Sequence, residues 1–149
     1  MKLTDITITR LIPAPAAKVF DLWMDPSSPG GPWYGAARTI LNPVVDGLFY
    51  VAMVHEGRTW PHYGRFLRIE RPRQIEYTWM SEGTKGVESV VAVTFSPRED
   101  QTPGYQTEVT LRHSGVPDDE IGRQHEEGWT WVLSMLAQHC GAGSSSVAP

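Results

Sequence analysis

The sequence has one cysteine, no cluster of basic residues and no long apolar segment. The single Cys140 excludes an internal disulfide and any CxxC metal or redox motif, so we expect a reducing compartment. Nucleic acid is a poor partner for a chain with net charge −4, because its binding requires concentrated positive charge. The longest apolar run, 48–54, is far shorter than the roughly 20 residues that span a bilayer. The N-terminus lacks the apolar core of a secretion signal, and a cytoplasmic protein is expected.

The chain of 149 residues, 40% of them hydrophobic, is long enough for one well-packed core and too short for two. We expect a single domain over residues 1–140. The remaining residues, 141–149, read GAGSSSVAP and are expected to form a flexible tail.

The first three quarters of the chain carry one short helical pattern and several strand patterns. Pro15 and Pro26 delimit the helix, whose Val19, Phe20 and Trp23 fall on one side. A turn-rich loop with Trp33 and Tyr34 follows. Runs of strand-like residues then alternate with turns, which favours an antiparallel meander. The expected strands are 5–12, 38–45, 48–55, 63–70, 74–80, 88–95 and 106–113.

Several of these strands have one face that is clearly more apolar than the other. A period of two places such residues on the same side of a sheet, which we take as the inner side. The predicted inward residues are Ile75, Tyr77, Trp79, Val91, Val93, Phe95, Val109, Leu111 and His113. The run 48–54 is apolar on both faces, so its inward face stays undecided.

A long C-terminal helix begins near Pro117, with acidic residues in its first turn that suit the helix dipole. One helix is too narrow to cover six or seven strands, so the sheet must curl around it. The predicted fold is therefore α+β, with a curved antiparallel sheet around this helix. Its predicted apolar side consists of Ile121, His125, Gly128, Trp129, Val132, Met135, Leu136 and His139.

Gly128 stands on that apolar side, where a glycine costs up to about 1 kcal/mol relative to alanine. Such a cost requires a compensating use, and we favour empty space: an apolar chamber with His125 as its one polar group is the usual composition of a small-molecule site. The alternative is that the glycine lets a bulky side chain such as Trp33 or Trp79 pack closely against the helix.

The sequence also resembles a known family over most of its length. The segments that carry the resemblance are ITRLIPAPAAKVFDLWMDP, PWYG, DGLFYVAMV, GRTWPHYGRFLRIERPRQIEYTW, VAVTF and TEVTLRHSGVPDDEIGRQHEEGWTWVLSMLA. They are similar to the heat-shock protein 90 ATPase activator homologue-like family of the SRPBCC (START/Bet v 1-like) superfamily. The resemblance implies a helix-grip fold with a deep hydrophobic cavity. Superfamily members bind lipids, hormones or polyketides, and some are cyclases or other enzymes.

The first functional hypothesis is therefore binding of an apolar small molecule between the sheet and the C-terminal helix, without a cofactor, a metal or an assigned catalytic residue. The residues expected to line this site are Trp33, Tyr34, Tyr77, Trp79, Val93, Leu111, His125, Gly128, Trp129 and Val132.

A second hypothesis is an enzyme of cyclase or hydrolase type that uses His125 or His113. His125 would act as a general base or orient a ligand carbonyl. The alternative for His125 is a neutral core histidine bonded to a backbone carbonyl or to the hydroxyl of Tyr34 or Tyr77. Glu126 and Glu127 are expected in solvent.

Metal chemistry has little support in the sequence. Both His-Glu pairs fail the HExxH zinc pattern, because Thr59 and Trp129 occupy the position of the second histidine. A three-histidine zinc site from His62, His113 and His125 has no spacing rule behind it.

A third hypothesis is a protein-interaction module, dimeric or linked to a chaperone. Leu48 and Tyr50 replace polar residues of many relatives, and an exposed apolar strip of this kind often marks an interface. The eukaryotic co-chaperone carries a separate chaperone-binding domain, for which 149 residues leave no room, so a co-chaperone role is not expected.

Overall fold

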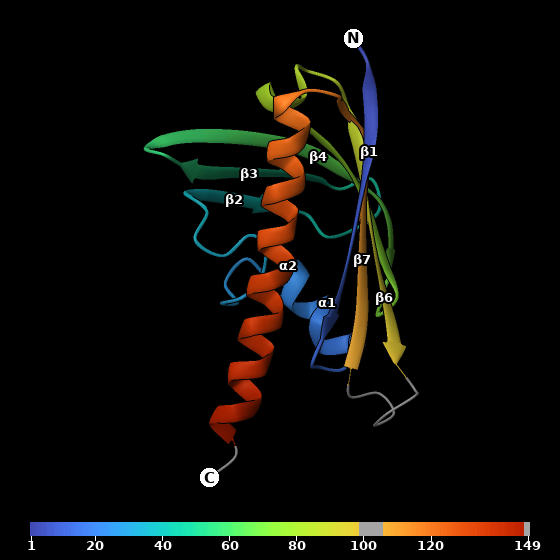
Figure 1. The fold of residues 1–149 in the computed structure, drawn as a ribbon, viewed down its shortest axis with the longest axis vertical. Coiled ribbons are helices and arrows are strands. Elements are labelled where there is room, and N and C mark those ends of the chain that lie inside the picture. The colour runs from blue at the N-terminus through green and yellow to red at the C-terminus, as the bar shows by residue number, and fades with distance from the viewer. Residues whose placement is uncertain (99–105, 148–149) are drawn as a thin grey trace.

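The computed structural model describes residues 1–98 and 106–147 and contains one antiparallel sheet. Its strand order is β1-β7-β6-β5-β4-β3-β2. Figure 1 shows β2, β3 and β4 crossing behind the long C-terminal helix, while β1 and β7 run beside it. This arrangement confirms the predicted fold class. The elements are β1 (Leu3–Ile12), α1 (Ala16–Met24), β2 (Arg38–Leu41), β3 (Leu48–His55), β4 (Arg58–Glu70), β5 (Gln74–Ser81), η1 (Glu82–Thr84), β6 (Ser89–Arg98), β7 (Gln106–Pro117) and α2 (Glu120–Val147).

Two strand boundaries differ from the prediction for identifiable reasons. β2 ends at Leu41, because Pro43 cannot donate to a ladder and the chain turns there. β4 begins at Arg58, five residues before its predicted start. Glu56 and Gly57 both have positive φ, which allows a two-residue turn and lets β3 and β4 pair up to that turn.

The inward faces predicted for β5, β6 and β7 are confirmed, since all nine residues are buried. On β3 the structure decides what the sequence left open. Phe49 and Val51 are buried, and Leu48 is 68% exposed. Tyr50 lies opposite Ile40 and Tyr63. An apolar strip therefore crosses the outer face of β2, β3 and β4.

The sheet bends within β4. The β4–β5 register shifts between Phe66 and Arg68, and such irregularities increase the local twist. Gly64 of β4 lets the ring of Phe49 on β3 approach the backbone closely. A Cβ at position 64 would lie 2.2 Å from that ring. The curled sheet can thus cover both helices.

The buried side of α2 is formed by Trp129, Leu133, Leu136 and Cys140. Cys140, close to the predicted tail, belongs to this buried side with only 1% of its side chain exposed. The helix leans toward β1, where Arg10 donates a hydrogen bond to Ser134. Met135, which the sequence placed on the apolar side, is exposed.

α2 continues through Val147, past the start of the predicted tail. Residues 99–105 and 148–149 lie outside the described residues, and flexibility of the tail stays a prediction. Among the described residues no helix is both long and apolar enough to cross a membrane.

Candidate functional site

A chain of hydrogen bonds runs from α2 into the sheet through His113 of β7. The indole Nε1 of Trp129 donates to Nδ1 of His113 at 3.0 Å. Because an indole N–H only donates, Nδ1 carries no proton, and the neutral ring is protonated on Nε2. Nε2 lies 2.7 Å from Ser89 Oγ, whose hydroxyl donates to the carbonyl of Trp79 at 2.5 Å. Both nitrogens of His113 are therefore occupied.

This bonding fixes His113 in its neutral form. Burial, with a smaller contribution from the neighbouring His125, lowers the pKa of His113 to about 3. With Nδ1 accepting from Trp129, the ring has no lone pair left for a substrate proton. His113 is therefore not suited to act as the general base that the enzyme hypothesis requires.

His125 of α2 lies beside His113, with 5.3 Å between the ring centroids. Its Nδ1 is 2.9 Å from the carbonyl oxygen of Ile121. A carbonyl only accepts, so Nδ1 donates and Nε2 of the neutral ring keeps a bare lone pair. Burial lowers the pKa of His125. The predicted alternative of a histidine bonded to a backbone carbonyl is thus observed, and no tyrosine hydroxyl takes part.

Two further polar residues, His62 and Ser81, face each other across β4 and β5. His62 stacks on Trp79 with ring centroids 4.4 Å apart. Burial lowers the pKa of His62 to about 4, and His125 contributes in the same direction. The sequence analysis considered His62 only as a metal ligand and did not identify Ser81 as a candidate site residue. The inward period of β5 continues from Tyr77 and Trp79 to Ser81, a signal that could have found it.

Polar atoms without a hydrogen bond of normal geometry gather along this inner face. Three successive inward residues of β5 each contribute one, and His62 and Trp23 of α1 add others. Trp23 and Tyr77 approach each other without a hydrogen bond of normal geometry. Buried polar groups in native proteins are almost always paired, so such a row requires an explanation. The buried atoms without a hydrogen bond of normal geometry among the described residues are Trp23 Nε1, His62 Nδ1, Tyr77 Oη, Trp79 Nε1 and Ser81 Oγ. Four of these five side chains have looser polar partners: Trp23 and Tyr77 have each other, His62 has backbone groups of Val51 and Trp60, and Ser81 has the backbone N–H of Thr84.

The predicted site residues divide into a buried group and a group at the edge of α2. The buried members are joined by ring contacts, such as Trp33 with Trp79 at 5.9 Å and Trp79 with Trp129 at 5.2 Å. Tyr34 lies apart from them, with its side chain 53% exposed. The buried members are Trp33, Tyr77, Trp79, Val93, Leu111 and Trp129; His125 and Val132 are half-buried; Gly128 is exposed.

The family model described as "Activator of Hsp90 ATPase homolog 1-like protein" matches residues 13–141, which is most of the chain. The chain belongs to this family. The resemblance seen in the sequence is thereby confirmed. No protein of curated function matches the chain.

Several solved structures share the fold of this chain, and their sequence identities are low enough that they show the fold alone. Protein CV1439 from Chromobacterium violaceum is 19% identical to this chain, with a TM-score of 0.75. The match covers 91% of this chain and 96% of the CV1439 chain. CalU16 from Micromonospora echinospora is 20% identical, with a TM-score of 0.68. The match covers 97% of this chain and 81% of the CalU16 chain. DynU16, a protein of the dynemicin biosynthetic locus, is 18% identical, with a TM-score of 0.71. The match covers 93% of this chain and 48% of the DynU16 chain.

In this family member, Gly128 lies on the flank of α2. A Cβ built there would meet no atom within 4 Å. The alternative in which Gly128 admits a bulky side chain against the helix is therefore wrong. The prediction that Gly128 lies on the buried side of the helix is also wrong, because the residue is exposed. An apolar chamber beside it stays a prediction.

The Gly128→Ala substitution is expected to stabilise the protein by up to about 1 kcal/mol, because alanine adds helix propensity and contacts nothing. Urea denaturation of the variant and wild type checks this value. A loss of stability would show that the space beside Gly128 is filled.

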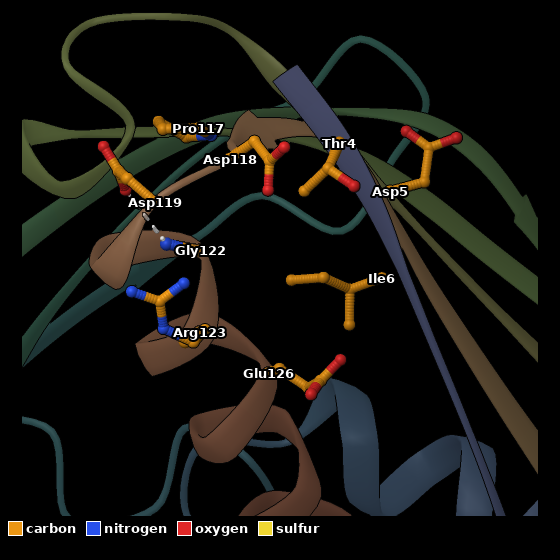
Figure 2. A pocket seen from close by; sticks show the side chains of 9 residues that line it. All are labelled: Thr4, Asp5, Ile6, Pro117, Asp118, Asp119, Gly122, Arg123 and Glu126. Atoms are coloured by element: carbon orange, nitrogen blue, oxygen red, sulfur yellow. Dashed lines mark hydrogen bonds between the residues drawn. The ribbon is translucent and has the colours of Figure 1, made fainter. Parts of the chain in front are cut away.

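Two pockets are found in the described part of the chain. The first, of about 180 Å³, is bounded by β1 and the first turns of α2 (Figure 2). Figure 2 shows Asp119 beside Gly122, whose backbone N–H donates to its carboxylate at 3.4 Å. Asp5 pairs with Arg112, and Asp118 with Lys2, so this acidic rim is largely neutralised.

The second pocket, of about 590 Å³, is lined by residues that include Ala16, Pro72 and Phe95. Neither pocket contains a residue of the predicted ligand site. Among the described residues, no group of three or more His, Cys, Asp or Glu side chains could hold a metal ion. Glu126 and Glu127 are exposed, as predicted.

Proposed function

We propose that this protein binds a predominantly aromatic small molecule between the sheet and α2. The observation that carries the proposal is the row of polar atoms among the buried rings that lack a hydrogen bond of normal geometry within the protein. Each such atom costs about 1–3 kcal/mol when it stays unpaired. A ligand with a few polar groups on an apolar body would offset that cost.

The rings supply the apolar part of the binding surface. Trp33, Trp79 and Trp129 are joined by contacts of 5.2–5.9 Å. Flat aromatic ligands pack favourably against such faces and edges. A site of apolar rings with a few convergent polar groups has the usual composition of a small-molecule site.

Entry to the site is expected beside Gly128. This residue adjoins open space, and its helix neighbours His125 and Val132 are half-buried. A larger side chain at position 128 would stand between solvent and these two residues. The site therefore has a specific position at which binding can be blocked.

Binding is favoured over catalysis, because both ring nitrogens of His113 are committed to protein partners. DynU16 shares the fold and comes from a biosynthetic locus, which is a setting in which small-molecule binding is expected.

The neutral fluorophore N-phenyl-1-naphthylamine tests the proposal. We expect saturable one-to-one binding with a rise in fluorescence, and about tenfold weaker binding to the Gly128→Leu variant. The Thr130→Leu variant, which adds a leucine at another exposed position of α2, is the control and should bind as wild type does. Native mass spectrometry of freshly purified protein should detect a retained small molecule. Equal affinity of the Gly128→Leu variant and wild type would refute the proposed entry, and absence of binding to wild type would refute the function.

A further inference from the structure

We propose that the outer face of β2, β3 and β4 binds a second copy of this chain in a two-fold symmetric dimer. This face lies on the side of the sheet opposite to α2 (Figure 1). The inference is therefore independent of the ligand site proposed between the sheet and α2. The apolar residues of this face, called the outer strip from here on, are Ile40, Leu48, Tyr50, Val54 and Tyr63.

The alternation of side chains along β3 separates the outer strip from the core. Phe49 and Val51 of β3 are buried in the hydrophobic core. Successive side chains of a strand point to opposite faces, so Tyr50 points outward. Ile40 of β2 and Tyr63 of β4 lie opposite Tyr50 and share its face, and the rings of the two tyrosines are 5.2 Å apart. The strip is thus continuous across three strands.

The outer strip leaves a large apolar area in solvent. Leu48 is 68% exposed, Val54 56%, Ile40 51% and Tyr63 49%, and Tyr50 is half-buried. Together these residues expose about 450 Å², a size at which a patch on a monomer often has a binding role. A standard interface buries about 800 Å² on each partner, of which about 60% is apolar. The apolar area of the strip therefore matches what one partner of a dimer contributes.

The face of the sheet suits association better than its edge does. β2 is the edge strand beside the outer strip and has only four residues. A short edge strand offers few backbone groups for pairing and is one way in which proteins avoid edge-to-edge association. Because the strip spans three strands, a second copy buries it only by packing face to face.

Charged residues at the two ends of the outer strip are arranged for a second copy of the same chain. At the first end of β3, Arg65 lies on the β4 side, and Asp46 lies in the connection to β2. At the other end, Arg38 lies on the β2 side, and Glu56 lies in the turn to β4. The two cations therefore occupy one diagonal of the strip, and the two anions occupy the other.

These four charges are available to a partner. Among the described residues, Arg38, Arg65 and Asp46 form no ion pair, and Glu56 has only the exposed His55, at 3.8 Å. A two-fold axis in the plane of the interface turns the strip over, so each cation of one copy faces the anion of the other. A uniformly acidic or basic partner would instead bring like charges together at two corners. The pattern thus favours a second copy.

Sedimentation velocity of the wild-type protein between about 1 and 100 µM tests the inference. We expect a reversible monomer–dimer equilibrium with a Kd on the order of 10 µM. Leu48→Asp should weaken the association at least about tenfold, because it buries a charge in the apolar contact. The matched control Leu11→Asp makes the same change at an exposed leucine of β1, at the far edge of the sheet, and should dimerise as wild type does.

An exchange of charges shows whether this face makes the contact. The variant Arg38→Glu/Arg65→Glu carries anions at all four corners of the strip, and Asp46→Lys/Glu56→Lys carries cations at all four. Each variant alone should be monomeric because like charges meet, and an equimolar mixture should form a one-to-one dimer.

Three results would overturn the inference. They are a wild-type protein that is monomeric at about 100 µM, a dimer that Leu48→Asp leaves intact, and a mixture of the two charge variants that stays monomeric. None of these results bears on the small-molecule site, because that site lies on the opposite face of the sheet and is tested with the fluorophore.

Discussion

Lowering the pH from 7 to 5 is expected to reduce the free energy of unfolding by about 4 kcal/mol. His113 and His62 are neutral in the folded protein, with pKa values lowered to about 3 and 4 from the ordinary 6.5. The unfolded chain binds a proton at each histidine as the pH falls below about 6.5, and the folded chain does not. The unfolded state is therefore favoured progressively, by about 2 kcal/mol for each histidine between pH 7 and 5.

Urea denaturation at pH 7, 6 and 5 measures this effect. Carboxylates such as Asp21, whose pKa is lowered by Arg71, contribute stability that is lost only as the pH falls through and below about 3.8, so they do not interfere. His62→Phe should halve the dependence on pH, and His55→Ala, at an exposed position, should not change it. A free energy of unfolding that is constant between pH 7 and 5 would show that these histidines are not buried in the neutral form.

The Trp129→Phe variant is expected to lose about 3 kcal/mol of stability. Phenylalanine lacks the indole N–H, so Nδ1 of His113 would be left buried without a donor, at a cost of about 1–3 kcal/mol. The smaller ring also leaves unfilled volume next to Trp23 and Trp79, which adds to the loss.

Trp131→Phe is the matched control, because Trp131 lies two residues further along α2 and is 63% exposed. Its effect should stay within about 0.5 kcal/mol. Nitrogen-15 NMR of the imidazoles should assign the proton of His113 to Nε2 in wild type. Equal stability losses in the two tryptophan variants would contradict the hydrogen-bond chain described here.

The sequence predicted the inward faces of β5, β6 and β7 because each strand has one apolar and one polar face. β3 did not allow such a prediction, since 48–54 is apolar on both sides. Its orientation depends on pairing with β4, which places Val51 opposite His62 and Phe49 opposite Gly64.

The candidate site could be predicted only in part. Trp79 and Trp129 are aromatic residues on predicted inner faces, and the structure brings their rings together. Ser81 was missed because the predicted strand ended one residue earlier, and His62 because its predicted strand began one residue later. Gly128 was placed wrongly, since the glycine is exposed on the flank of α2 and does not lie on its buried side.

The sequence by itself determined the family resemblance, the element order and the inner faces of three strands, because local periodicity and turn residues specify these features. The rotation of α2, the tautomers of His113 and His125 and the row of polar atoms without normal hydrogen bonds were decided only by the tertiary structure. Each depends on which groups from distant parts of the chain meet, and the wide apolar side of the helix is compatible with several rotations. In the observed rotation the indole of Trp129 donates to His113.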